Sequence, residues 1–123
     1  MKKIAIFNCQ FANQRCTGAG CIQAFNERSG AFASYGANEL QLVSFTRCNG
    51  CGQDWENDEG LAKKIVRIEA LADVVHFGGC TFRNGQECSF ITQLAGRLAA
   101  DGMTVVRGTH VHASRRTPAV KEQ

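Results

Sequence analysis

The sequence predicts one α/β domain of three layers, with a four-stranded parallel sheet between two layers of helices. Short apolar runs alternate along the chain with stretches of helical periodicity, and no proline occurs before Pro118. Hydrophobic residues make up 44% of the 123 residues. A chain of this length buries about two thirds of its unfolded surface, which is enough for a core without disulfides. Strands joined by helical crossovers form parallel sheets with helices on both faces.

The first half of the chain predicts a strand, a helix and a second strand. Residues 2–8 (KKIAIFN) are a short apolar, β-branched run, which predicts a buried strand. Residues 20–36 place apolar side chains at near-helical spacing and predict a helix, which Ser29 and Gly30 can interrupt. Residues 39–45 (ELQLVSF) alternate apolar and polar side chains and predict the second strand.

The second half contains the clearest helix. Asn57 or Asp58 can cap it. Its apolar face consists of Leu61, Ile65, Ile68, Leu71 and Ala72. Residues 72–77 (ADVVHF) then predict a third strand, and residues 87–100 predict a third helix. Residues 104–108 (TVVRG) predict the fourth strand.

Right-handed crossovers allow few orders for four parallel strands, and we expect the flavodoxin-like order 2-1-3-4. A β-α-β-β-α-β sandwich would need two successive strands with no helix between them, and the pattern has none. We expect the domain to span residues 1–112. Residues 113–123, with Arg115, Arg116 and Lys121, are expected to form a basic, flexible tail.

Charge and hydropathy exclude two classes of partner. The net charge is +3, and no basic stripe with interleaved aromatic residues is present, so we expect no nucleic acid partner. No apolar run approaches the ~20 residues of a membrane span, so we expect no membrane association. The apolar run within MKKIAIFNCQ is too short for the core of a signal peptide. These features predict a cytoplasmic protein. The sequence does not identify a protein partner.

Cysteine is the unusual component of the composition. The seven cysteines are Cys9, Cys16, Cys21, Cys48, Cys51, Cys80 and Cys88. The cytoplasm keeps thiols reduced. An odd number of cysteines there argues against a disulfide framework and favours metal binding or thiol chemistry.

Ligand-type residues follow each of the four predicted strands. In chain order they are Cys9, then Cys48 and Cys51, then Cys80, and last His110 and His112. The carboxyl ends of parallel strands meet at one edge of the sheet, which is where open α/β folds bind ligands. Thiolate sulfur and imidazole nitrogen are the ligands that zinc prefers. The pattern therefore predicts a metal site at this edge, with zinc the first choice.

Other residues have simpler interpretations. His76 lies inside a predicted strand, so we expect a hydrogen-bonded core histidine. Cys21 and Cys88 lie at predicted helix starts, where a cysteine can simply fill core space. The turn CTGAG at 16–20 can cradle an anion before a helix, but it lacks the Walker lysine, and a tight ligand loop is the preferred interpretation.

The motifs in order resemble the CGGC-domain family. They are NC (8–9), CTGAGC (16–21), FTRCNGC (45–51), DVVHFGGC (73–80), EC (87–88) and GTHVH (108–112). The family is named for a central Cys-Gly-Gly-Cys, and metal binding is attributed to it from its cysteines and histidines. The namesake falls on residues 48–51, where Asn49 replaces the first glycine. Asparagine also tolerates a left-handed backbone.

The resemblance implies nine candidate metal ligands. They are Cys9, Cys16, Cys21, Cys48, Cys51, Cys80, Cys88, His110 and His112. Nine exceed the four ligands of one tetrahedral zinc, so two ions bind, a cluster binds, or some thiols are not ligands. Two alternatives stay open: an iron–sulfur electron-transfer protein, and a thiol-disulfide oxidoreductase that uses the Cys48-Cys51 dithiol. The residues name no reaction and no catalytic group.

Overall fold

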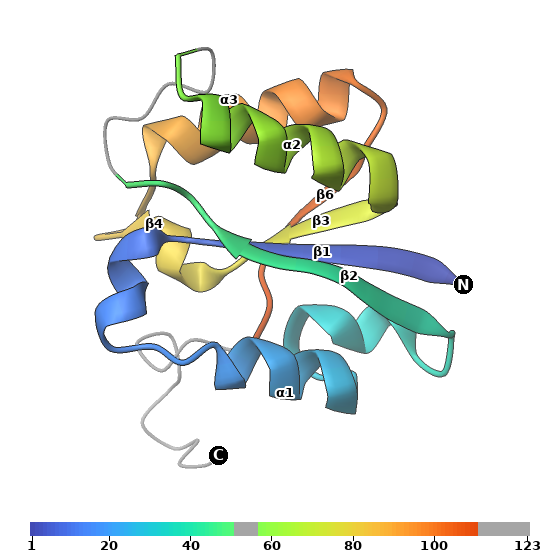
Figure 1. Cartoon of the computed structure of the whole chain (residues 1–123). Helices are drawn as coiled ribbons and strands as arrows, with labels where there is room; N and C mark the ends of the chain where they lie inside the picture. Colours follow the sequence, from blue (N-terminus) through green and yellow to red (C-terminus); the bar gives the residue numbers. More distant parts are fainter. Residues whose placement is uncertain (51–56, 111–123) are drawn as a thin grey trace.

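The central sheet contains four parallel strands in the spatial order β2-β1-β3-β6 (Figure 1). The computed structural model describes residues 1–50 and 57–110. The strands are β1 (Lys2–Asn8), β2 (Leu40–Arg47), β3 (Val74–Phe77) and β6 (Thr104–Arg107). This confirms the predicted order 2-1-3-4 for the sheet. One difference is a short antiparallel hairpin before the last helix, β4 (Phe82–Arg83) with β5 (Gln86–Glu87), which the sequence pattern did not predict.

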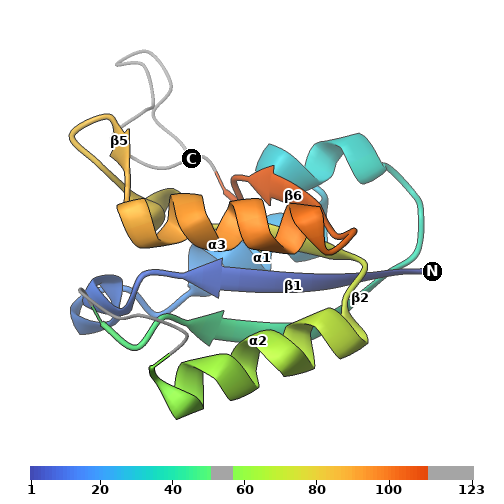
Figure 2. The same ribbon diagram turned by 90° about the horizontal axis from the view of Figure 1, so that it is seen from above.

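Helices cover both faces of the sheet, as Figures 1 and 2 show. One face carries α1 (Ala19–Glu27) and the 3-10 helix η2 (Gly30–Tyr35). The other face carries α2 (Glu59–Leu71) and α3 (Ser89–Ala100). The three-layer prediction is therefore confirmed. None of the helices in residues 1–50 and 57–110 has the length and apolar character needed to cross a membrane.

Local backbone chemistry sets the helix boundaries. The helix predicted over residues 20–36 is divided, because Arg28 and Gly30 both adopt φ of 57°. Asp58 caps α2 by accepting a hydrogen bond from the Leu61 amide at 2.9 Å. α3 begins at Ser89, later than predicted, because Glu87 pairs with Phe82 in the hairpin.

Alternate side chains of β1 enter the two cores. Ala5 and Phe7 pack against α2 and α3, whereas Ile4 and Ile6 pack on the side of α1 and η2. Because side chains alternate along a strand, a slip of one residue would exchange the two sets. β1 and β3 are buried on both faces, which explains why their sequences are almost continuously apolar.

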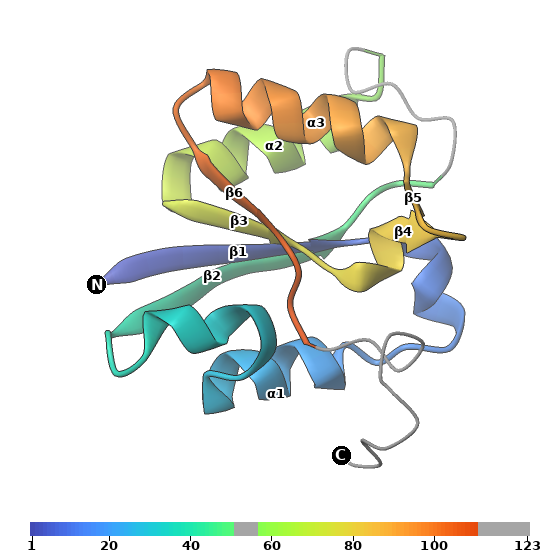
Figure 3. The same cartoon turned by 180° about the vertical axis from the view of Figure 1, so that it is seen from behind.

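The carboxyl ends of the strands lie at one edge, at the left end of the sheet in Figure 1. The 3-10 helix η1 (Gln10–Gln14) follows β1 there, and a second one, η3 (Gly79–Thr81), follows β3. Figure 3 shows the chain after β6 running toward α1. This edge brings together the segments that contain most of the candidate ligands.

Candidate functional site

Hydrogen bonds to sulfur join the ends of β1, β2 and β3. The Cys9 amide donates to Cys80 Sγ at 3.2 Å, and the Gln10 amide donates to Cys48 Sγ at 3.4 Å. The backbone directly after β1 therefore holds one thiol from the end of β2 and one from η3. The expectation that these segments meet at the carboxyl edge is confirmed.

Cys80 lies among three other thiols. Burial raises the pKa of its thiol, and the hydrogen bond from the Cys9 amide opposes this. The thiols of Cys9, Cys21 and Cys16, as thiolates, raise the Cys80 pKa further by charge repulsion. Such repulsion acts at short range, so the four thiols share one region at this edge. We call Cys9, Cys16, Cys21 and Cys80 the thiol cluster.

Cys21 lies in the first turn of α1 and connects the thiol cluster to the segment after β6. Its Sγ is 3.1 Å from Thr109 Oγ1 and 3.6 Å from His110 Nδ1. The imidazole of His110 packs against Gly20, where an added Cβ would lie 3.1 Å from the ring. The CTGAG turn thus allows the close approach of the His110 imidazole to Gly20, and its interpretation as a ligand loop stays a prediction.

Asn8 ends β1 beneath the thiol cluster, and the sequence analysis did not select it. Its side chain is 1% exposed, and its Nδ2 donates to Cys21 Sγ at 3.6 Å. Its Oδ1 has no hydrogen-bond partner among the described residues. A buried amide oxygen without a donor is uncommon and calls for an explanation such as a bound group. The signal in the sequence was an amide that ends an apolar strand directly before Cys9.

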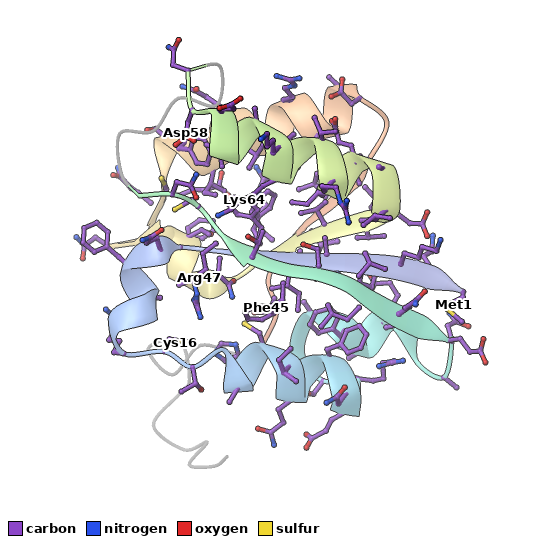
Figure 4. All side chains as sticks on the ribbon, in the orientation of Figure 1. Met1, Cys16, Phe45, Arg47, Asp58 and Lys64 are labelled. Atoms are coloured by element: carbon purple, nitrogen blue, oxygen red, sulfur yellow. The ribbon has the colours of Figure 1, made fainter. Side chains whose placement is uncertain are left out.

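A polar network joins the loop that contains Cys48 to α2, and three of its residues, Arg47, Lys64 and Asp58, are labelled in Figure 4. Lys64 Nζ donates to Asn49 Oδ1 at 2.6 Å and to the Arg47 carbonyl at 2.8 Å. Asn49 Nδ2 donates to Asp58 Oδ1 at 3.3 Å. Asn49 therefore ties the Cys48 loop to the cap of α2. That helix begins at Glu59, well beyond Cys48 in the chain, so Cys48 is not part of the first turn of α2.

Arg47 places a cation beside the loop that contains Cys16, and the sequence analysis did not select it either. Its guanidinium lies 5.8 Å from the centre of the Phe45 ring. Its Nη2 donates to the Cys16 carbonyl at 3.4 Å. In Figure 4, Arg47 and Phe45 both extend from β2 toward the α1 side of the sheet.

His76 is a hydrogen-bonded core residue, as predicted. Its Nδ1 lies 2.8 Å from the Gly108 carbonyl, which can only accept, so Nδ1 carries the proton. Nε2 then accepts from the Tyr35 hydroxyl at 2.7 Å. Burial lowers the pKa of this imidazole, and the bond to Gly108 opposes the shift. His76 holds the backbone directly before Thr109 and His110 in place.

The remaining candidates divide into two groups. Cys88 is exposed at the start of α3, and among residues 1–50 and 57–110 no hydrogen bond links its thiol to the thiol cluster. Cys51 and His112 lie outside the described residues. The tail predicted over residues 113–123 lies outside them as well.

The donor set fits a thiophilic cation by its chemistry. Four thiols and an imidazole are ligands that zinc prefers, and the unpartnered Asn8 Oδ1 lies beside them. In the described part of the chain, however, no three Cys, His, Asp or Glu side chains are arranged so that they could already hold an ion. Binding would therefore need side-chain movement, or ligands from Cys51 and His112.

A sequence profile of the CGGC domain matches residues 3–110 of this chain. The chain belongs to the CGGC domain family. The chain is similar to "Uncharacterized protein MJ0582" of Methanocaldococcus jannaschii, with 33% identity over 117 residues. The alignment covers 88% of this chain and 86% of the relative. No solved structure matches the chain. In this CGGC domain, the residue that departs from the family name, Asn49, is the one that links the motif to α2.

Proposed function

We propose that this CGGC domain binds a transition-metal ion, zinc in the first place, through the thiol cluster at the carboxyl edge of its sheet. The observation that carries the proposal is the gathering of Cys9, Cys16 and Cys21 around the half-buried Cys80, which accepts a hydrogen bond from the Cys9 amide. A divalent cation would hold these sulfurs as thiolates and offset the repulsion between them. Thiolate and imidazole are also the ligands that zinc selects.

The other candidates form a second set around the thiol cluster. His110 lies beside Cys21, and Cys48 shares the start of η1 with Cys80. Together with Cys51 and His112, they supply enough donors to bind a second ion, or to replace one of the four thiols as a ligand of the first. Because thiols lose their protons when they bind a metal, affinity should fall as the pH is lowered.

The test is metal analysis together with absorption spectroscopy, on protein purified without oxygen and without chelator. About one zinc per chain with no visible band would support one four-ligand site. Two zinc ions per chain would mean that the second set of residues also binds metal. Iron with sulfide and broad visible absorption would replace the proposal with an electron-transfer protein. Absence of metal, with reactive thiols, would leave the dithiol oxidoreductase.

Two cysteine variants make the test specific. Cys80→Ser should lose the metal, because it removes the thiol at the centre of the thiol cluster. Cys88→Ser is the matched control, since that thiol is exposed and should leave the metal content unchanged. Cobalt titration of both variants reports thiolate ligation through charge-transfer absorption. Equal metal content in the two variants would refute the assignment.

A further inference from the structure

The outer side of α2 and the free edge of β2 form a surface away from the thiol cluster. A hollow of about 250 Å³ is lined by Ser44, Thr46, Lys63, Lys64 and Arg67. A second hollow of about 470 Å³ is lined by Glu59, Ala62, Lys63, Val66 and Arg67. Because the two share Lys63 and Arg67, they form one continuous surface, which we call the α2–β2 groove. Figure 2 shows α2 beside β2.

The floor of the first hollow is an edge strand. In the sheet order, β2 pairs with β1 on one side and has no neighbour on the other within the described residues. An edge strand presents backbone N–H and C=O groups to any extended chain that comes alongside. Ser44 and Thr46 add hydroxyls, and their side chains form no hydrogen bond with another described residue. This floor is suited to a peptide backbone.

The walls of the groove are positively charged. Lys63 and Arg67 are exposed, and neither forms an ion pair with a described residue. Lys64 is held by the Arg47 carbonyl and by Asn49, which fixes its charge beside the groove. Among the described residues that line the groove, Glu59 is the one carboxylate. The groove therefore attracts negative charge.

Part of the groove is apolar. Val66 is 63% exposed on the outer side of α2, with Ala62 one turn before it. Isolated exposed valines are common on protein surfaces. Here, however, the valine lies between two cations that form no ion pair within the described chain, Lys63 and Arg67, and beside the edge strand β2. A ligand that covers it needs an aliphatic group as well as negative charges.

We propose that the α2–β2 groove binds an acidic, extended peptide segment of a partner protein. The segment adds to β2 as a further strand, with its carboxylates on Lys63 and Arg67 and an aliphatic side chain on Val66. A second copy of this chain fits less well, because a symmetric contact would set the same cations against each other. Nucleic acid also fits less well, because none of the described residues that line the groove is an aromatic one that could stack on a base.

The test uses the full-length protein and a fluorescent eight-residue peptide, Thr-Glu-Thr-Val-Thr-Glu-Thr-Glu, whose glutamates and valine share one face of an extended strand. Anisotropy should give saturable binding that weakens as salt is added. The double variant Lys63→Glu/Arg67→Glu should weaken binding at least tenfold. Lys2→Glu/Lys3→Glu is the matched control, because it changes the net charge equally at two exposed residues outside the groove, and it should bind normally. Circular dichroism verifies that both variants fold.

Hydrogen exchange tests the mode of binding. Peptide addition should slow exchange of backbone amides within β2, Leu40–Arg47, because strand addition protects the free edge. Three results would overturn the proposal. The control variant could weaken binding as much as the groove variant does, or a peptide with lysine in place of glutamate could bind equally well. Hydrogen exchange in β2 could also stay unchanged on peptide addition. Tighter binding of oligothymidine would overturn the proposal as well, and so would dimerisation in sedimentation that the groove variant abolishes. None of these outcomes depends on the metal.

Discussion

Tyr35→Phe tests the hydrogen-bonded pair that holds the segment before His110. The change removes the hydroxyl that donates to His76 Nε2 at 2.7 Å, while the ring of residue 35 stays in place. His76 is fully buried, so in the variant its Nε2 is left without a donor inside the core. Leaving a buried acceptor unsatisfied costs about 1–3 kcal/mol, and we expect about 1–2 kcal/mol because Tyr35 itself is only partly buried.

The expected change in melting temperature follows from the size of the domain. An unfolding entropy of about 2.1 cal/mol/K per residue gives about 0.26 kcal/mol/K for 123 residues. A loss of about 1–2 kcal/mol then lowers the melting temperature by about 4–8 °C. Calorimetry or thermal circular dichroism measures it directly. The assay should be repeated on the metal-free and metal-loaded protein, because the Gly108 carbonyl that His76 holds precedes Thr109 and His110.

The control for this prediction is Thr92→Val. It also removes a hydroxyl donor, in this case one to Glu87 Oε1 at 2.7 Å, but on an exposed surface where water replaces the bond. We expect a shift of less than about 0.5 kcal/mol. The assignment of a buried, stabilising pair is wrong if Tyr35→Phe has the melting temperature of the wild type, or if it loses no more stability than Thr92→Val.

Three further predictions concern groups away from this pair. Glu69→Gln should stabilise the protein at neutral pH by less than about 1 kcal/mol. A hydrogen bond with Asp101 raises the pKa of the Glu69 carboxyl, so its favourable contribution is present at low pH and is lost as the pH rises through that pKa. In urea melts, the stability at pH 7 relative to pH 4 should therefore be higher in the variant than in the wild type, and an equal difference in both proteins would contradict this. Gly96→Ala should raise stability by about 0.5–1 kcal/mol, because it lies inside α3 with open space at its Cβ position; an unchanged or lower urea midpoint would contradict this. Gly78→Ala should destabilise the fold and disturb the thiol cluster, because its Cβ would lie 2.0 Å from Asn8 Oδ1; wild-type stability and metal content in this variant would show that the contact is not needed.

A separate prediction concerns how the free energy of unfolding falls at acid pH. Burial lowers the pKa of His76, so the folded protein resists the proton that the unfolded chain accepts below about pH 6.5. The contribution of His76 is therefore full above that pH and is lost as the pH falls from there through its lowered folded pKa. Urea melts between pH 7.5 and 5 should lose stability on this account. A His76→Gln variant with the same pH slope would assign the loss to other groups.

Residues with a strong local signal were predictable. Residues 2–8 predicted β1 with its observed bounds, because a strand buried on both faces is continuously apolar. Asp58 was one of two predicted caps for α2, because a carboxylate before an apolar helical face satisfies its first amides. The alternation of strands and helices gave the parallel sheet, and the sheet placed Cys9, Cys48 and Cys80 at one edge.

Residues without such a signal were missed. Asn8, Arg47 and Asn49 are polar side chains whose importance depends on partners more than eight positions away in the sequence. The β4–β5 hairpin has two-residue strands, too short to produce an alternation pattern. The interruption at Ser29 and Gly30 was predicted, but the left-handed conformation of Arg28 just before it was not, because sequence propensity does not predict that conformation for a non-glycine residue.

The sequence by itself determined the fold class, the strand order and the edge of the sheet at which thiols gather. These features follow from hydrophobic periodicity and from the handedness of crossovers, and both are local properties of the chain. Only the tertiary structure decided which thiols are neighbours, that Cys88 lies apart from them, and that Asn8 is buried beneath the thiol cluster with an unpartnered oxygen. Distances between side chains on different segments depend on how the layers pack, and no spacing along one segment contains that information.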